Sequence, residues 1–393
     1  MIRCTVGVFA HNEAHNVQRT LHALLSQELQ QVSISEIIVV ASGCTDNTVA
    51  LAQELASAHP VIAVQVEAHR TGKAAAMHQL MSVAQGEVIV FVGADTLPAP
   101  DAIERLVEPF ADPTVGMTGA RVIPLNSPGT FLGFAVQMLW HVHHRLALRQ
   151  PKLGELVACR NVIPDFPEDT ATDDLALEAL ITRCGYRLVY APKAVVYNRG
   201  PENVGDFVIQ RRRIFAGEVG IVLKYHYYSS SLILRNVVPL AIDAMISYPR
   251  YMLWTLGVMA LEMWSRALGA VDAFRGREDY IWRHAKTTKK VVTAAEPVTL
   301  ISLRWSPHEL DSTSLLLRLE ELPTSVGSVF WWDTSHGEVF LKVAGGDPAM
   351  EWIQSRLLDR PHPADAGARA SVAAPRISWR LIQLASQASP PAS

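Results

Sequence analysis

The first third of the chain alternates between strand-like and helix-like runs. Strand-forming residues fill Arg3–Phe9, Glu36–Ala41, Val61–Val66 and Glu87–Val92, and helix-like runs at Ala14–Glu28, Thr48–Ala58 and Lys73–Ala84 separate them. This alternation is typical of βαβ units, so we expect an α/β fold with a mostly parallel sheet flanked by helices. Ligands of such sheets bind at the carboxyl ends of the strands, where the polar residues form the candidate site.

Charge and cysteine content exclude several classes of function. The formal net charge of −3 argues against a nucleic-acid partner held by bulk positive charge. The four cysteines are far apart and form no CxxC pair, which argues against a zinc site or a disulfide framework. A strand-like run begins at once, without a basic and apolar leader, so this end does not predict secretion. The 393 residues leave room for two or three domains.

Four polar clusters follow the strand-like runs: "AHNEAHN", "ASGCTDNT", "EAHRTGKAAAMH" and "GADT". Each has an ordinary structural interpretation by itself, because Asn12 and Asp46 suit helix starts and Arg70 suits a solvated loop. Four clusters at one edge of one sheet favour a binding site instead. The cations beside Gly72, at a helix start, would suit a diphosphate.

Together with two later motifs, these clusters resemble family 2 glycosyltransferases of the GT-A type. The matching stretches are "AHNEAHNVQRTLHALLSQ", "IIVVASGCTDNTVALAQ", "RTGKAAAMHQLMSVAQGEVIVFVGADTLP", "TDDLALEALITRCGYRLVYAPKAVVY" and "QRRRIFAG", in this order within Met1 to Gly220. The resemblance implies an inverting enzyme that moves a sugar from a nucleotide-sugar donor to a lipid or cell-envelope glycan acceptor. It places a catalytic GT-A domain at residues 1–225.

The resemblance assigns nucleoside binding to the first two strand ends. Phe9, His11 and Glu13 match the family's first turn. Ser42 stands where the family usually has an aspartate that contacts the base. Because Ser42 carries no charge, the choice of nucleotide stays open.

Phosphate and metal contacts are implied by the next two clusters. Arg70 and Lys73 match a basic loop that lies near the donor phosphates in the family. Ala94 and Asp95 match the end of the DxD motif, with Asp95 as the acid that chelates the metal and Gly93 in place of the first acid. A divalent ion beside a diphosphate also takes phosphate and water oxygens. We therefore expect Mg²⁺ or Mn²⁺ to bind at Asp95, mainly together with the donor.

The stretch "DTATDDLALEAL" places Asp173 and Asp174 at the start of an amphipathic helix. Two acids at a helix N-terminus also stabilise the helix dipole, which is the ordinary alternative. The family's Thr-Glu-Asp motif lies at this place, and its final aspartate deprotonates the acceptor hydroxyl. Asp174 matches that residue, Asp173 replaces the glutamate, and the helix dipole is expected to keep Asp174 ionised.

The stretch "QRRRI" matches the family's QxxRW motif, with Ile214 in place of the tryptophan that helps to hold a growing chain in polysaccharide synthases. This replacement favours transfer of a limited number of sugars per acceptor. Gln210 and Arg213 are candidate contacts to the acceptor or the donor phosphates. For Arg211 and Arg212, a basic stripe near a membrane face is an equally good interpretation.

A hydrophobic segment at 226–290 predicts attachment to a membrane. Its best stretch, Tyr251 to Val271, has the roughly twenty residues that cross a bilayer, but it contains Glu262 and Arg266. Spanning the bilayer and lying in its interface both stay open. The basic flank "WRHAKTTKK" suits the cytoplasmic leaflet, so we expect the cell membrane, with the catalytic domain on the cytoplasmic side.

Three further segments complete the chain. Pro128 to Gln150 is a candidate second interfacial helix, and its His141, His143 and His144 are interpreted as surface side chains rather than as a metal site. Residues 291–360 predict a small α+β module. Its stretches "PVTLISLRW", "HELDSTSLLLRLEEL", "SVGSVFWWD", "GEVFLKVAG" and "DPAMEWIQSRLL" predict a strand, a helix, a hairpin of two strands and a second helix, an order similar to a ferredoxin-like module. The tail at 361–393, rich in Ala, Ser and Pro, is expected to be disordered.

Two other functions stay open. A catalytically silent protein that binds sugar nucleotides, with the C-terminal module as its output, is favoured by Gly93 and Ser42 and opposed by Asp174. A nucleotidyltransferase would carry a glycine-rich signature near the first strand, which "AHNEAHN" lacks.

Overall fold

The computed structural model describes residues 1–127, 129–233, 235–236, 238–240, 242 and 252–276, and the backbone of four strands at 298–304, 327–333, 338–344 and 378–383. The chain divides into two compact units, Met1–Val291 and Val292–Ser393.

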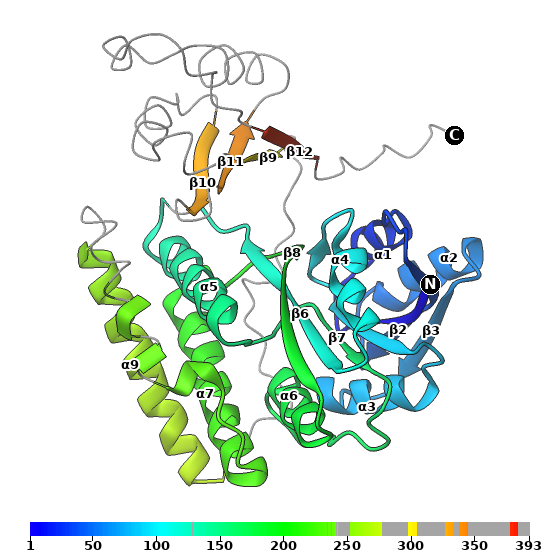
Figure 1. Cartoon of the computed structure of the whole chain (residues 1–393), viewed down its shortest axis with the longest axis horizontal. Helices are drawn as coiled ribbons and strands as arrows, with labels where there is room; N and C mark the ends of the chain where they lie inside the picture. The colour runs from blue at the N-terminus through cyan, green and yellow to red at the C-terminus, as the bar shows by residue number, and fades with distance from the viewer. Residues whose placement is uncertain are drawn as a thin grey trace. The chain divides into compact units, whose positions relative to one another are not determined.

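The first unit is built on an eight-stranded sheet with the order β3-β2-β1-β4-β7-β6-β8-β5 (Figure 1). The first four strands are parallel and alternate with three helices: β1 Ile2–Ala10, α1 Val17–Leu25, β2 Val32–Ser42, α2 Thr48–Ala58, β3 Ile62–Glu67, α3 Lys73–Val83 and β4 Val88–Gly93. The predicted α/β architecture, a sheet flanked by helices, is confirmed. A parallel sheet covered by helices on both faces requires strands that are apolar along their whole length. In β4 the residues from Val88 to Val92 are all buried, as this requires.

The second half of the sheet differs from a parallel arrangement. β7 (Val157–Arg160) pairs antiparallel with both β4 and β6 (Val115–Pro124). β8 (Arg187–Asn198) is parallel to β6, and the short β5 (Leu97–Pro98) pairs antiparallel with β8. The sheet is therefore mixed, because β7 inserts between two neighbours that run the other way. The parallel expectation came from the first third of the chain, where it holds.

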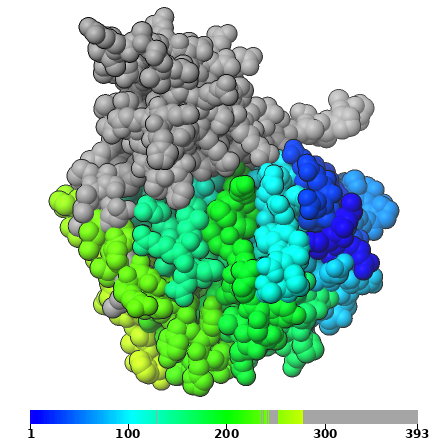
Figure 2. Space-filling model, viewed as in Figure 1, coloured from blue at the N-terminus to red at the C-terminus, as the bar shows by residue number. Residues whose placement is uncertain are grey.

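Helices surround this sheet and extend the unit to one side. After α4 (Ala102–Val107) and a 3₁₀ turn at Glu108–Ala111 come α5 (Phe131–Arg149), α6 (Asp173–Arg183), α7 (Val204–Tyr225), a 3₁₀ turn at Ser230–Leu232 and α9 (Met252–Phe274). α7 and α9 run side by side (Figure 1), and their atoms, green to yellow-green, form one continuous surface in Figure 2. At Gly269 the helices come so close that an added Cβ would lie 2.5 Å from the Arg212 carbonyl oxygen.

The face of α9 that contacts α7 carries small and charged residues. Arg211 of α7 donates to both carboxylate oxygens of Glu262, over 2.7 and 2.6 Å, and Arg266 donates to the same carboxylate over 2.8 Å. Arg212 pairs with Asp272. The basic-stripe interpretation of Arg211 and Arg212 is therefore wrong, because both guanidinium groups are used in contacts between helices.

Among the described residues, the structure contains no helix with the length and apolar character needed to cross a bilayer. This finding covers most of the predicted stretch Tyr251 to Val271. The charges of Glu262 and Arg266, which argued against a span in the sequence, are paired with each other and with Arg211.

His144 of α5 is not the surface side chain that we expected, whereas His141 and His143 are half-buried. His144 is buried, and its Nδ1 forms a 2.7 Å hydrogen bond with the Tyr190 hydroxyl. The ring of His143 meets the edge of Trp140 at 5.0 Å between centroids. Both side chains belong to the packing of the first unit.

The second unit contains a four-stranded antiparallel sheet with the order β10-β11-β9-β12. Its strands are β9 Val298–Arg304, β10 Gly327–Asp333, β11 Glu338–Ala344 and β12 Ser378–Gln383. The first three fall where strands were expected. β12 lies inside the tail that was expected to be disordered, so the folded part of this unit continues beyond residue 360. The two expected helices of the module and the basic flank lie outside the described residues.

Candidate functional site

A cavity of about 470 Å³ lies where the carboxyl ends of β1, β2 and β4 meet the starts of α3 and α6. Eleven of the twelve site residues expected from the sequence line it: Phe9, His11, Glu13, Ser42, Arg70, Lys73, Asp95, Asp173, Asp174, Gln210 and Arg213. The twelfth, Ala94, is buried and is not part of the lining; its backbone N–H donates to the Phe9 carbonyl over 3.0 Å. Side chains far apart in the sequence therefore share one cavity.

The ends of β1 and β2 are fastened to each other and to the loop before α3. The Nδ1 atom of His11 donates to the Ser42 carbonyl over 2.6 Å. Gly43 follows with φ +54°, and a Cβ at this position would lie 2.5 Å from the Arg70 backbone nitrogen. Glycine permits both the left-handed backbone and this close approach. The Arg70 loop is thus held over the end of β2.

Glu13 and Phe9 are fixed by contacts behind the cavity. The Glu13 backbone N–H donates to the Thr48 hydroxyl, and its carboxylate accepts from the Asn16 side chain, each over 2.8 Å. The Phe9 ring stacks on Phe91 of the core, with 6.2 Å between centroids and 10° between planes. These contacts hold Glu13 and Phe9 in place at the end of β1.

Asp95 stands alone as an acid at the end of β4. A Cβ added at Gly93 would lie 2.7 Å from the Asp95 Oδ1 atom, so an acid at 93 would require Asp95 to shift. Within the described part of the chain, no three His, Cys, Asp or Glu side chains come together as a metal-binding group. A hard divalent cation prefers oxygen ligands. The single carboxylate of Asp95 therefore fits a cation whose other oxygen ligands include those of a phosphate-bearing ligand.

Asp173 and Asp174 are the first two residues of α6, and both carboxylates lie near the ammonium group of Lys73. The Lys73 ammonium, on the first residue of α3, lies 2.5 Å from Asp173 Oδ2 and 3.8 Å from Asp174 Oδ1. The Asp173 side chain is 4% exposed, whereas that of Asp174 is 29% exposed. Lys73, expected at the donor phosphates, thus contacts the acidic pair, and Asp174 is the more accessible of the two acids.

The pKa of Asp174 suits proton transfer near neutral pH. Burial raises this pKa to about 6, although the Lys73 ammonium pulls it down and the Glu155 backbone N–H donates to the carboxylate. We expected the helix dipole to keep Asp174 ionised, and with a pKa of about 6 the carboxylate is mostly ionised at neutral pH, although burial raises that pKa above its usual value. A base is most effective when its pKa lies near the working pH.

Glu155 is a cavity residue that sequence reasoning missed. Its backbone has φ +60°, a left-handed conformation that residues other than glycine adopt uncommonly and that gathers at functional sites. Burial and the nearby Asp95 charge raise the pKa of Glu155 to about 7. Burial lowers the pKa of Arg213 to about 10, and the acids Asp173 and Glu155 oppose this shift. The only signal in the sequence was an acid after Gly154, just before β7.

Two family models match the chain: "Glycosyl transferase family 2" over residues 5–158 and "Glycosyl transferase family group 2" over residues 88–265. A poly-beta-1,6-N-acetyl-D-glucosamine synthase from Staphylococcus epidermidis is 27% identical over 229 residues, 54% of this chain and 54% of that protein. The protein of the same name from Staphylococcus aureus strain COL is 26% identical over 229 residues, with the same coverage. The chain thus spans about half the length of the curated relatives it matches.

Among solved structures, a mannosyltransferase from Pyrobaculum calidifontis in complex with GDP-Man and Mn²⁺ is similar to this chain. The identity is 24% and the TM-score 0.51, over 70% of this chain and 88% of that one. This likeness shows a shared fold, the GT-A type of mixed α/β sheet flanked by helices. The two family models together cover residues 5–265, and the chain is therefore a member of glycosyltransferase family 2.

Proposed function

We propose that this chain is an inverting glycosyltransferase that moves a sugar from a nucleotide-sugar to a glycan or lipid-linked acceptor at the cytoplasmic face of the cell membrane. The observation that carries this proposal is the single cavity in which the ends of β1, β2 and β4 meet the acidic start of α6. A mannosyltransferase of similar fold was solved with GDP-Man, and the curated relatives are named as synthases of a poly-N-acetylglucosamine. Both support a nucleotide-sugar donor.

The donor would lie along the parallel strands. Phe9, His11 and Ser42 would contact the nucleoside, because they come from the two adjacent strands β1 and β2. Arg70, held over the end of β2, would face the phosphates, where a guanidinium can form two parallel hydrogen bonds. Gln210 and Arg213 of α7 would contact the phosphates or the acceptor from the opposite side.

Asp95 would hold a divalent cation, Mg²⁺ or Mn²⁺, together with the donor diphosphate. The mannosyltransferase of similar fold was solved with Mn²⁺, which supports a metal of this type. When bound, such an ion offsets the negative charge that grows on the leaving diphosphate.

Asp174 would remove the proton from the acceptor hydroxyl. The hydroxyl oxygen attacks the anomeric carbon while the bond from that carbon to the diphosphate breaks, so a single displacement inverts the configuration. Asp173, which is buried against Lys73, would hold the start of α6 in place and so orient the side chain of Asp174. The carboxylate with greater exposure to the cavity is therefore the base.

Attachment to the membrane is supported by the outer face of α9. Its buried residues are Val258, which packs in an apolar cluster with Leu132 and Phe207, and the small or polar Thr255, Ser265, Gly269 and Asp272. Its exposed large side chains are apolar and recur at helical spacing: Leu253, Leu256, Met263, Trp264, Val271 and Phe274. A helix that turns its apolar face outward suits the lipid interface. We therefore place α9 in the interface, parallel to the membrane surface.

The transfer assay that tests this function uses full-length protein in detergent with several nucleotide-sugars. The wild-type protein should release nucleoside diphosphate from at least one of them. Asp174→Asn should lower the transfer rate by about 10²–10⁴-fold, the usual effect of losing a general base. Its donor affinity should change little, because the residue faces the acceptor. Asp173→Asn should reduce the rate less, because its role is to fix the helix start.

Two results would contradict this assignment. If Asp173→Asn is inactive while Asp174→Asn turns over normally, the base is the other acid. If both variants transfer at the wild-type rate, the base lies elsewhere in the cavity.

Asp95→Ala should lower metal-dependent turnover by more than about 10²-fold. Removing a residue that only supports a metal ligand already lowers metal affinity or activity by about 10–100-fold, and Asp95 is proposed to bind the metal directly. Metal-dependent donor binding, measured by calorimetry with and without Mn²⁺, should be lost in parallel. Asp169→Ala is the matched control, since that side chain is 70% exposed and lies outside the cavity lining. An Asp95→Ala protein that keeps its response to a metal titration would show that the cation is held elsewhere.

Charges on the outer face of α9 should weaken membrane binding. In flotation with vesicles of phosphatidylcholine and phosphatidylglycerol, the full-length protein should rise with the lipid. The double variant Leu253→Glu with Met263→Glu should bind several times more weakly, because each carboxylate must leave water to enter the interface. Val66→Glu, at an exposed position on β3, controls for added charge. Equal flotation of both variants would place the membrane contact elsewhere.

A further inference from the structure

The cavity extends well beyond the strand ends, between α5, α7 and α9. This region, the helical end of the cavity, is lined by Trp140 and His143 from α5, Arg211 and Glu218 from α7, and Glu262 from α9, together with Lys152. Only Arg211, within "QRRRI", belongs to a motif of the sequence analysis, and it was not among the candidate site residues.

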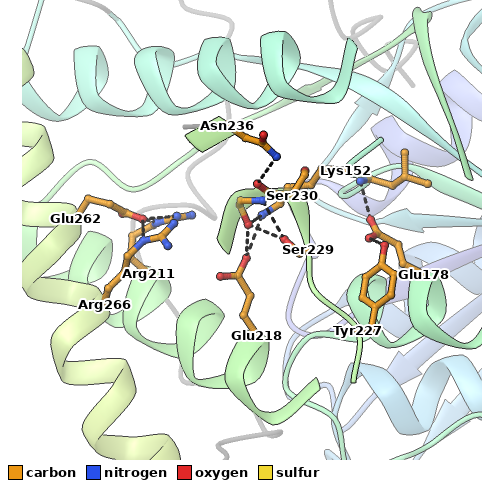
Figure 3. Close-up of polar contacts among 12 residues, drawn as sticks. Lys152, Glu178, Arg211, Glu218, Tyr227, Ser229, Ser230, Asn236, Glu262 and Arg266 are labelled. Carbon is orange, nitrogen blue, oxygen red and sulfur yellow. Dashed lines mark hydrogen bonds and ion pairs between the residues drawn. The ribbon is translucent and has the colours of Figure 1, made fainter. Parts of the chain in front are cut away.

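One wall of the helical end consists of fixed ion pairs (Figure 3). Lys152 donates to Glu218 over 3.0 Å and to the Ser231 hydroxyl over 2.5 Å. Glu262 accepts from both Arg211 and Arg266. The side chains of Glu218 and Glu262 are 4% and 14% exposed. Buried pairs of this kind add little to stability relative to apolar packing, and here they also line the cavity.

The charge balance of this wall indicates what kind of ligand it suits. Each cation that lines it already has a carboxylate partner, so an incoming phosphate would have to compete with Glu218 or Glu262 for its contacts. A neutral hydroxyl group can donate to a carboxylate oxygen and accept from an ammonium or guanidinium group without separating the pair. A wall of paired charges therefore matches a neutral, polyhydroxylated molecule.

The other wall offers a flat apolar surface. Trp140 is half-buried on α5 and lines the cavity, and its ring and that of His143 form an edge-to-face pair with 5.0 Å between centroids. Burial lowers the pKa of His143 to about 3, so this ring is neutral near pH 7 and adds no charge to the cavity. An aromatic face beside hydrogen-bonding groups suits a sugar ring, which has an apolar C–H face and a polar rim.

We propose that the helical end of the cavity is a saccharide subsite, in which a neutral acceptor sugar stacks on Trp140 and its hydroxyl groups bind the Lys152–Glu218 and Arg211–Glu262 pairs. This inference rests on the proposed transferase function and narrows it. The acceptor is a neutral glycan end rather than a phosphorylated lipid. The Asp174 carboxylate lines the same cavity and is available to the acceptor hydroxyl.

The test measures equilibrium binding of two probes to the full-length protein in detergent: a neutral tetrasaccharide of N-acetylglucosamine, and farnesyl phosphate. Trp140→Leu keeps an apolar side chain but removes the aromatic face, and it should weaken tetrasaccharide binding by about tenfold. Trp140→Phe keeps a ring and should bind within about threefold of wild type. Leu148→Ala, at an exposed position on the same helix and outside the cavity lining, should bind like wild type.

The inference would be overturned if wild type does not bind the tetrasaccharide, or if the Leu and Phe variants of Trp140 bind it equally. It would also be overturned if binding of farnesyl phosphate depends on Trp140. Donor turnover is measured separately in the same preparations. Tetrasaccharide binding that depends on Trp140, without turnover of any nucleotide-sugar, would contradict the transferase function while leaving the subsite in place. Turnover of a nucleotide-sugar, combined with tetrasaccharide binding that does not depend on Trp140, would support the transferase function and contradict the subsite.

Discussion

The contact of Lys73 with Asp173 and Asp174 is the interaction on which the site depends. Lys73 begins α3, in the parallel half of the sheet, and the two acids begin α6, which contacts β6, β8 and α7 in the mixed half. Two adjacent carboxylates in a buried place repel each other, and loss of hydration favours their protonated forms. One ammonium group between them offsets both effects. It also ties the proposed donor end of the cavity to the proposed base.

Ion pairs also join α7 to α9. Glu262 and Arg266 looked in the sequence like obstacles to a membrane span. In the structure Glu262 accepts from Arg211 of α7, which joins the two helices, and from Arg266 on its own helix. Most of the large apolar side chains of α9 are exposed, while its contacts with α7 use ion pairs and the small residue Gly269. One arrangement thus provides a wall of the cavity and a surface suited to lipid. In the proposed account, the same two helices line the acceptor end of the cavity and hold the enzyme at the membrane surface.

Much of the first unit could be predicted because its signals are local. Strand and helix periodicity in the first third predicts β1 to β4, and parallel strands bring their carboxyl ends to one edge, so Phe9, Ser42 and Asp95 meet in space. The direction of β7 and the partner of Lys73 could not be predicted, because both depend on packing between distant segments. Trp140 and Glu155 were missed for the same reason, since each becomes a cavity residue only through the fold.

The central claim is that Asp174 is a half-buried base whose pKa is raised by burial and lowered by the Lys73 ammonium, and the pH dependence of kcat/KM tests it most directly. Because the base must be ionised, the wild-type rate should rise through a pKa near the value of about 6 set mainly by burial, and then level off. Lys73→Met removes the positive charge, so the pKa of Asp174 should increase and the rising limb should move to higher pH. The variant should then lose far more activity at pH 6 than at pH 8. A rising limb that stays in place, or moves to lower pH, would contradict this account.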